Sequence, residues 1–169
     1  MIKNPILIRK KKYFDKRGFF QELYLLKEFN IKVVFSALAY SKKNVIRGLH
    51  FQTINKQTKV IYVVQGNILD VIVNLDKKSK NFGKVSKYNL KAGDTLIVPN
   101  KYAHGYECIS KDCIVLYHLD NYRNIKGENG IFYKDKNLRI RWTTKKPVVS
   151  KRDKLGKSFL EFKKKIKTL

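Results

Sequence analysis

Short apolar runs separated by turns fill the middle of the chain and limit the folds open to it. Between about Val33 and His118 these runs are rich in β-branched and aromatic residues: VVFSALAY, VIRGLHF, VIYVVQGNILDVIVNL, VSKYNL, TLIVP and CIVLYHL. QGN at residues 65–67 and LKAGD at residues 90–94 are turn sequences, each between two apolar runs. Closely spaced strands joined by such turns are typical of a β-sandwich or barrel. The sequence therefore predicts a mainly β protein.

The two ends of the chain differ from this strand region. The stretch RGFFQELYLLKEFN predicts a short helix from Gln21 to Phe29, and the polar C-terminal end predicts another from Ser158 to about Lys167. No repeat, linker or shift in composition divides the chain, and 169 residues are enough for one hydrophobic core. We therefore expect a single domain over residues 1–169.

The apolar runs and the cysteines bear on where the protein works. No apolar run approaches the roughly 20 residues that a membrane-spanning helix needs. The N-terminal sequence MIKNPILIRKKKYF lacks the apolar core of a signal peptide. We therefore expect a soluble cytoplasmic protein with no membrane partner. Cys108 and Cys113 could face each other across a hairpin, but a cytoplasmic chain favours free thiols, and their spacing is not a metal motif.

The formal net charge of +25 is the most unusual feature of the composition. The basic residues are scattered along the whole chain and are mostly lysine, which favours a solvated lysine surface over a nucleic-acid interface. A nucleic-acid-binding β-barrel stays an alternative, and it predicts steeply salt-dependent binding to DNA or RNA. On either interpretation the charge should attract anionic small molecules.

The run NVIRGLHFQ, residues 44–52, places two polar side chains in an otherwise apolar strand. Arg47 and His50 are three residues apart, so their side chains leave opposite faces of a regular strand unless Gly48 interrupts the pleat. A lone histidine on an apolar strand is more often a hydrogen-bonded core residue than a catalyst. Gly48, and a carboxylate at Asp153 that could orient an imidazole, favour a catalytic interpretation.

A second histidine segment, IVPNKYAHGYE, places His104 after a strand that ends at Pro99. With the Gly-Asp pair at 93–94, this segment resembles the second half of the cupin signature. A metal-binding cupin needs H-x-H followed by a glutamate to gather its ligands, whereas residues 50–52 of this chain read HFQ. The missing ligand argues against a metal site.

Five segments occur in the order and spacing of one enzyme family: NVIRGLHFQ, QGNILDVIVNLDKKSKNFGK, VPNKYAHGYE, VLYHLDNY and GIFYKDKNLRIRW. From about Arg17 to Asp153 the chain resembles the dTDP-4-dehydrorhamnose 3,5-epimerases and their relatives that act on other nucleotide-linked 4-keto-6-deoxy sugars. The resemblance implies a cupin-type jelly roll with short helices near the N-terminus and at the C-terminus. It also implies epimerisation of a nucleotide-diphospho-4-keto-6-deoxy sugar at C3 and C5, with no metal and no organic cofactor.

The same resemblance implies which residues carry the chemistry. A proton on a carbon next to a ketone is acidic because its removal gives an enolate, and imidazole suits the base role near neutral pH. His50 is implied as the base, with Asp153 fixing its tautomer. Tyr117 is implied as the acid that returns a proton on the opposite face. Lys59, nine residues after His50, matches a lysine that stabilises the enolate oxygen.

Further residues match the substrate-binding positions of the family. Arg47 and Arg17 match cations that hold the diphosphate, a role that suits the fork of donors on a guanidinium. His104 matches a histidine that lines the pocket. In DKRGFFQEL, Phe20 and Glu22 complete a cluster with Arg17. In the family this segment reaches across a dimer to the neighbour's nucleotide, so the resemblance implies a homodimer.

Two departures from the family pattern concern the substrate. Relatives usually carry Q-x-N-x-S before the R-G-L-H motif, but this chain reads FSALAYS, with Phe35 and Ala37 in place of Gln and Asn. Tyr122 is implied as a substrate-binding aromatic, but Arg123 follows it where relatives often have a second aromatic that positions the sugar. The nucleotide and the extent of epimerisation therefore stay open. The alternatives are a C3-only epimerase, a 3,4-ketoisomerase on another nucleotide sugar, and a non-catalytic ligand-binding cupin.

Overall fold

The computed structural model describes residues 2–23 and 26–165. Its elements in chain order are β1 (Ile6–Arg9), β2 (Tyr13–Asp15), β3 (Gly18–Phe20), α1 (Leu26–Phe29), β4 (Phe35–Lys42), β5 (Val45–Gln52), β6 (Lys59–Gln65), β7 (Asn67–Asn74), β8 (Val85–Lys91), β9 (Asp94–Val98), β10 (Tyr102–Cys108), β11 (Asp112–Leu119), β12 (Glu128–Gly130), β13 (Val148–Val149), α2 (Lys151–Lys154) and α3 (Phe159–Lys165). The predicted mainly β fold is confirmed, and so are the turns between β6 and β7 and between β8 and β9.

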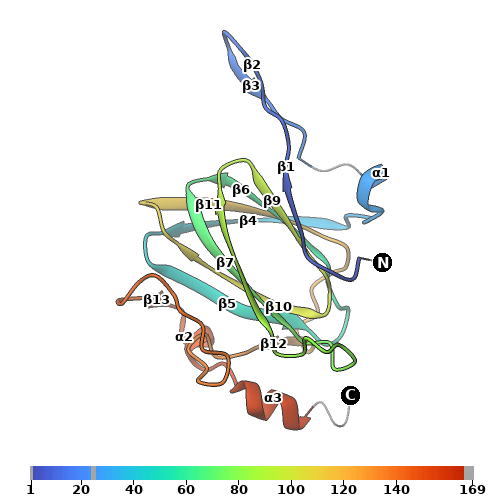
Figure 1. Ribbon diagram of the computed structural model, residues 1–169, viewed down its shortest axis with the longest axis vertical. Helices are drawn as coiled ribbons and strands as arrows, with labels where there is room; N and C mark the ends of the chain where they lie inside the picture. Colours follow the sequence, from blue (N-terminus) through green and yellow to red (C-terminus); the bar gives the residue numbers. More distant parts are fainter. Residues whose placement is uncertain (1, 24–25, 166–169) are drawn as a thin grey trace.

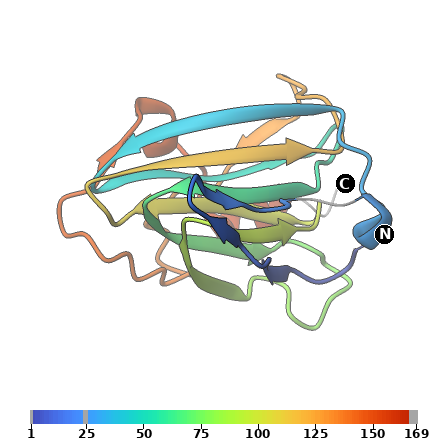
Figure 2. The same cartoon turned by 90° about the horizontal axis from the view of Figure 1, so that it is seen from above.

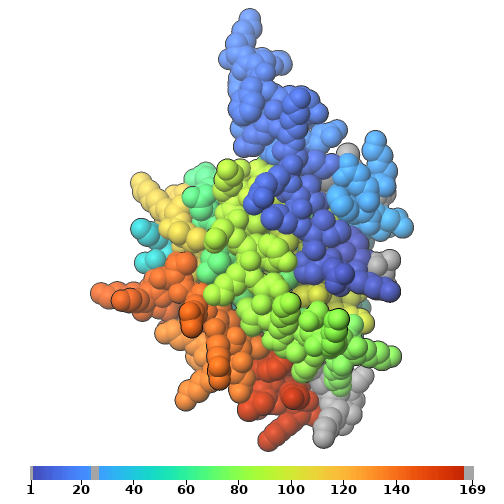
Figure 3. All heavy atoms as spheres, in the orientation of Figure 1, coloured from blue at the N-terminus to red at the C-terminus, as the bar shows by residue number. Residues whose placement is uncertain are grey.

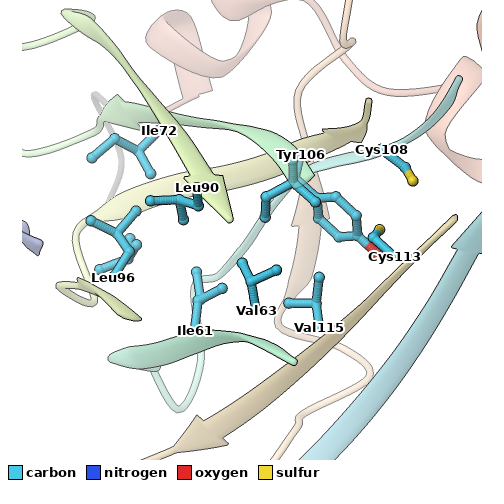
Figure 4. Close-up of a cluster of buried hydrophobic side chains, with 11 residues drawn as sticks. Ile61, Val63, Ile72, Leu90, Leu96, Tyr106, Cys108, Cys113 and Val115 are labelled. Atoms are coloured by element: carbon cyan, nitrogen blue, oxygen red, sulfur yellow. The ribbon is translucent and has the colours of Figure 1, made fainter. Parts of the chain in front are cut away.

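The strands form two large sheets (Figures 1 and 2). One sheet has the order β1-β9-β6-β11-β4, and the other has the order β12-β5-β10-β7-β8, with β13 parallel to β5. Neighbouring strands in sequence often lie in different sheets, as β4 and β5 do, which is the arrangement of a jelly roll. The main core lies between the sheets, where Ile61 and Val63 of β6 pack with Ile72 of β7 and Val115 of β11 (Figure 4).

Strand β7 is apolar on both faces because two layers of side chains cover it. Ile68 and Ile72 belong to the core between the sheets, whereas the alternate residues Val71 and Val73 belong to a second cluster on the outer face. Phe159 of α3 and the partly buried Trp142 pack in that outer cluster. The polar C-terminal region therefore supports the fold by covering the six-stranded sheet.

The N-terminal helix is shorter than the predicted Gln21–Phe29. α1 begins at Leu26, and residues 24–25 lie outside the described part of the chain. The side-chain amide of Gln21 donates to the backbone carbonyls of Lys10 and Gly93, and this anchoring holds the chain outside a helix after β3. Residues 2–23 and 26–165 contain no helix that is both long enough and apolar enough to cross a membrane.

The predicted C-terminal helix is present as α3. The Ser158 hydroxyl accepts from the backbone N–H of Glu161 and donates to the Glu161 carboxylate, which caps the helix start. The predicted end near Lys167 lies outside the described residues. The one-turn helix α2 between β13 and α3 was not predicted from the sequence.

A hairpin of β2 and β3 projects from the body of the molecule (Figures 1 and 3). Its aromatic side chains are exposed, with Phe14 at 74% and Phe20 at 67% of the maximum. The Arg17 guanidinium pairs with the Asp15 carboxylate at the turn, at 2.6 Å.

The two cysteines lie close to the turn that joins β10 and β11. Cys108 and Cys113 are both free and buried, as predicted for the thiols of a cytoplasmic chain. Figure 4 shows them beside the ring of Tyr106 at one end of the core. Burial raises the pKa of the Cys113 thiol, so this group stays protonated and unreactive.

Candidate active site

Strand β5 is interrupted at Gly48. In the pairing with β10, His50 lies opposite His104 and Arg47 lies opposite Tyr106, so β5 carries one more residue than β10 between the two pairs. Gly48 has a φ of +121°, which favours glycine. This bulge interrupts the pleat, and both Arg47 and His50 line the same cavity although they are three residues apart.

The imidazole of His50 is held by Asp153. The distance between His50 Nε2 and Asp153 Oδ1 is 2.6 Å, and the backbone N–H of Gly48 donates to Asp153 Oδ2 at 3.1 Å. Burial alone would raise the pKa of Asp153, but the hydrogen bonds from His50 and Gly48 outweigh burial and lower this pKa. Asp153 is therefore an ionised carboxylate that accepts the Nε2 proton, which leaves Nδ1 as the ring nitrogen of His50 that could act as a base.

Local structure explains how Asp153 reaches His50. β13 pairs in parallel with β5 and leads directly into α2. The Ser150 side chain caps α2 by accepting from the backbone N–H of Asp153 at 3.1 Å. The pairing of β13 therefore places α2 beside β5, and the Ser150 cap fixes the start of α2 so that Asp153 reaches His50.

Lys59 begins β6 and lies buried beside His50. Its Nζ donates to the backbone carbonyl of His50 at 3.0 Å. Burial lowers the pKa of Lys59 to about 8, although the nearby carboxylates of Asp70 and Glu128 oppose this shift. The ammonium is therefore protonated at neutral pH but loses its proton in mildly basic solution.

His104 and Tyr117 lie close to each other deeper in the site. The Nε2 of His104 is 2.7 Å from Asp70 Oδ2, and burial lowers the pKa of His104 despite this carboxylate. The rings of His104 and Tyr117 meet edge-on with centroids 6.1 Å apart. Burial raises the pKa of Tyr117 well above its usual value, and the nearby Tyr106 and Asp70 add to this shift. Tyr117 therefore keeps its proton at neutral pH.

These side chains meet in one cavity of 660 Å³ between the sheets. Six of the predicted site residues line it: Arg47, His50, Lys59, His104, Tyr117 and Asp153. His50 comes from the six-stranded sheet and Tyr117 from the facing five-stranded sheet, so a bound ring would have a basic nitrogen and a phenol available from different directions. A base, a carboxylate that orients it, a cation and a neutral acid suffice for proton transfer at a carbon next to a carbonyl.

A family model described as dTDP-4-dehydrorhamnose 3,5-epimerase matches residues 1–161. This chain belongs to the dTDP-4-dehydrorhamnose 3,5-epimerase family. The enzyme is therefore an isomerase that acts on sugar nucleotides, and its two-sheet fold is the predicted cupin-type jelly roll.

Individual relatives agree with this membership over most of the chain. The dTDP-4-dehydrorhamnose 3,5-epimerase of Shigella flexneri is 34% identical over 169 residues, which cover 95% of this chain and 93% of the relative. The Bacillus anthracis enzyme of the same name, solved with TDP and PPi bound, is 36% identical with a TM-score of 0.89, and the match covers 92% of this chain and 94% of the other. The Legionella pneumophila enzyme, solved in complex with dTDP-4-keto-L-rhamnose, is 29% identical with a TM-score of 0.88, and the match covers 91% and 87% of the two chains.

Four predicted site residues of the enzyme do not line this cavity. Arg17 and Phe20 lie on the projecting β2–β3 hairpin, and Glu22 is exposed just after it. Tyr122 is also exposed, but its ring stacks on Phe35 with centroids 6.2 Å apart, and Phe35 lines the cavity. The first three residues were predicted to serve a partner's nucleotide, and that role stays a prediction.

An ion-pair cluster at the cavity wall was not predicted. The carboxylate of Glu128 binds Arg123 at 2.6 Å and Arg152 at 2.8 Å. Burial alone would raise the pKa of Glu128, but the two guanidinium groups outweigh burial and lower it. Arg152 could have been found because it precedes Asp153, whereas the five-residue separation of Arg123 and Glu128 matches no regular helix or strand spacing that would pair their side chains.

The lining of the enzyme's cavity on β4 is apolar. Phe35, Ala37 and Ala39 alternate along this strand and line the cavity. Ala37 pairs with Tyr117 of β11, so the substituted part of the family's Q-x-N-x-S pattern lies next to the predicted acid. The sequence departure therefore falls inside the site.

Proposed function

We propose that the enzyme epimerises a nucleotide-diphospho-4-keto-6-deoxy sugar at C3 and C5. The reaction is of the type that converts dTDP-4-dehydro-6-deoxy-D-glucose into dTDP-4-dehydro-L-rhamnose. The observation that carries the proposal is the His50–Asp153 pair, at 2.6 Å, in the same cavity as Tyr117 and Lys59. The names and bound ligands of the relatives support the substrate class.

Proton removal is the role proposed for His50. Its Nδ1 lone pair takes the proton from the carbon next to the C4 ketone, and the electron pair of that C–H bond becomes the enolate. The resulting imidazolium donates through Nε2 to the carboxylate of Asp153, which stabilises the charge. The low pKa of Asp153 supports this role because the carboxylate stays ionised while His50 gains its proton.

Charge on the enolate oxygen is balanced by Lys59 in this proposal. An ammonium in a buried site interacts strongly with a developing oxyanion because little water screens it. The proposal also gives His104 a contact with the substrate. Burial favours the uncharged form of His104, and its low pKa supports hydrogen bonding in place of proton transfer.

Proton return is the role proposed for Tyr117. Its hydroxyl donates a proton to the enolate carbon on the face opposite His50, which inverts the centre and leaves a phenolate. One inversion therefore adds a proton to His50 and removes one from Tyr117, and both groups must be reset before the next inversion. The raised pKa of Tyr117 supports this role because the reacting enolate meets a protonated phenol.

The diphosphate of the substrate is assigned to Arg47 and to Arg17 of a homodimer. The β2–β3 hairpin supports this arrangement because it projects from the body of the molecule (Figure 3) and its aromatic side chains are exposed. In the proposed dimer, Arg17, Phe20 and Glu22 of each hairpin contact the nucleotide bound by the other subunit. Tyr122 contributes an aromatic contact beside Phe35.

Proton NMR in D₂O with dTDP-4-keto-6-deoxyglucose tests the function directly. The enzyme should incorporate deuterium at C3 and C5, and a downstream ketoreductase should then give the rhamnose-configured product. If the enzyme incorporates deuterium at neither carbon, dTDP-4-keto-6-deoxyglucose is not its substrate. A panel of other nucleotide sugars in the same assay would identify the preferred base and hexose.

Epimerisation at C3 alone is the second candidate. A relative from Streptomyces niveus named dTDP-4-dehydrorhamnose 3-epimerase is 26% identical over 82% of this chain, and Arg123 stands where relatives often have the sugar-positioning aromatic. Deuterium at C3 without deuterium at C5 would favour this candidate.

For either reaction the proposed location of the enzyme is the cytoplasm, which the free thiols of Cys108 and Cys113 support. Cell fractionation would check that location.

A further inference from the structure

Arg47 is held in place by other groups of the same protein. Its Nε donates to Ser41 Oγ at 2.9 Å, and one NH2 hydrogen is donated to the backbone carbonyl of Tyr40 at 2.9 Å. A guanidinium has five N–H donors, so these two bonds leave other donors that a ligand in the cavity could use. The two fixed bonds also define the plane of the guanidinium.

Behind Ser41 lies a buried phenol. The Ser41 hydroxyl is 2.8 Å from the hydroxyl of Tyr106, and the two residues are 2% and 0% exposed. Tyr106 also lies directly opposite Arg47 in the pairing of β10 with β5. The Cys108 thiol donates to the backbone carbonyl of Ser41 at 3.4 Å, which ties this part of β4 to β10. The Ser41 oxygen is thus bonded to the guanidinium on one side and to the phenol on the other.

A buried pair of hydroxyl groups needs a reason in an apolar core. The ring of Tyr106 packs among apolar residues between the sheets, where phenylalanine would fill nearly the same volume (Figure 4). Its hydroxyl contributes no apolar contact, and burying it without a partner would cost free energy. The hydroxyl instead meets the one side chain that fixes Nε of Arg47.

We propose that Tyr106, acting through Ser41, is a positioning residue for the substrate's diphosphate. It holds the Arg47 guanidinium with its remaining donors toward the cavity, so that less side-chain freedom is lost when the diphosphate binds. This inference rests on the proposed role of Arg47 as a diphosphate ligand. It adds a specific requirement, which is that loss of the Tyr106 hydroxyl weakens binding of the phosphate groups more than it slows the proton transfers.

Tyr106→Phe is the test variant because it removes only the hydroxyl. We expect TDP and inorganic pyrophosphate to bind about 5- to 10-fold more weakly, consistent with the loss of one hydrogen bond in a charged network. Thymidine should bind as it does to the wild type, and KM should rise by a similar factor with little change in kcat. Tyr102→Phe is the matched control, because Tyr102 lies on the same strand as Tyr106. Its hydroxyl accepts from the Asn74 side chain, and neither residue lines the cavity.

Two further variants separate the possible outcomes. Ser41→Ala should give the same selective loss, and the double variant with Tyr106→Phe should be no weaker than Ser41→Ala alone. The inference is overturned if Tyr106→Phe binds TDP like the wild type, or if it weakens thymidine as much as pyrophosphate. Arg47→Ala distinguishes the underlying proposal. If this variant keeps full affinity for pyrophosphate, the diphosphate role of Arg47 itself is wrong.

Discussion

His50 and Asp153 are 103 positions apart in the sequence, and their side chains are joined by a 2.6 Å hydrogen bond. The second carboxylate oxygen accepts from the backbone of Gly48, so Asp153 contacts both the histidine and the bulge that aims it. A carboxylate bound on two sides cannot rotate freely, and the imidazole that it holds is fixed in one tautomer. Proton transfer at His50 should therefore depend on an oriented ring as well as on a basic nitrogen.

Asp153→Asn should lower kcat by about 10³-fold while the protein stays folded, because an amide can hold His50 in the wrong tautomer. The measurement is the rate of substrate deuteration in D₂O, with His50→Asn as the reference for complete loss. Deuteration near the wild-type rate in either variant would show that the substituted residue is not needed for proton removal.

Tyr117→Phe should separate the two proton transfers. His50 can still remove the substrate proton, so deuterium exchange with retained configuration should persist, while the yield of epimerised product falls by about 10²-fold or more. The assay follows deuterium content and product configuration in the same sample. Equal loss of exchange and product in a folded variant would contradict the assignment of Tyr117 as the acid.

The pH dependence of kcat/KM, which reports groups of the free enzyme, should show a basic limb from Lys59. The Lys59 pKa is about 8, so the ammonium proposed to stabilise the enolate is present below this pH and is lost above it. We expect kcat/KM to fall tenfold per pH unit well above pH 8. Lys59→Arg stays charged at that pH, and it should have a lower kcat/KM without this limb. A limb at the same pH in Lys59→Arg would assign it to another group.

Gly48→Ala should destabilise the protein strongly. A Cβ at this position would lie 2.5 Å from the Cα of Gly105 and 2.8 Å from the His104 carbonyl oxygen, and φ is +121°. We expect a loss of about 2–4 kcal/mol in the free energy of unfolding, measured by urea denaturation. Gly130→Ala is the control, because its nearest contact would be an ordinary 3.4 Å. Similar stability of the two variants would contradict the close packing of β5 on β10.

Mixed dimers should test the hairpin. If Arg17 serves the partner's nucleotide, a site needs His50 from one subunit and Arg17 from the other. Arg17→Ala and His50→Asn enzymes, each nearly inactive alone, should regain up to about a quarter of wild-type activity when refolded together, since random pairing makes half the dimers mixed and each has one complete site. No recovery in dimers shown by mass spectrometry to be mixed would place Arg17 in its own subunit's site.

The sequence carries some parts of this molecule more clearly than others. The short apolar runs rich in β-branched residues predict β6, β7 and β11 because a strand covered on both faces is apolar along its whole length. Gly48 between Arg47 and His50 signals an interrupted strand. The shorter α1 was missed because the Gln21 side chain bonds distant backbone groups, which no local propensity records.

Contacts between different structural elements explain the site residues that were missed. The Arg123–Glu128–Arg152 cluster joins a loop, a short strand and a one-turn helix, and single-sequence periodicity says nothing about such meetings. Tyr106 could have been predicted to face the site, because it lies two positions after His104 and so on the same face of a regular strand. Its proposed positioning role follows only from its contact with Ser41, which binds Arg47.

The placement of His50 and Tyr117 on facing sheets has a consequence for how the enzyme could change. The separation of these two side chains follows the thickness of the β-sandwich, which is set by the side chains of the core and not by any loop at the cavity mouth. A smaller residue in place of a large core residue such as Ile61 would let the two sheets relax partly toward each other and would shorten the distance between the proposed base and the proposed acid. Enzymes of this fold that evolve toward a new substrate should therefore vary the residues at the cavity mouth while the volume of the core between the sheets stays constant.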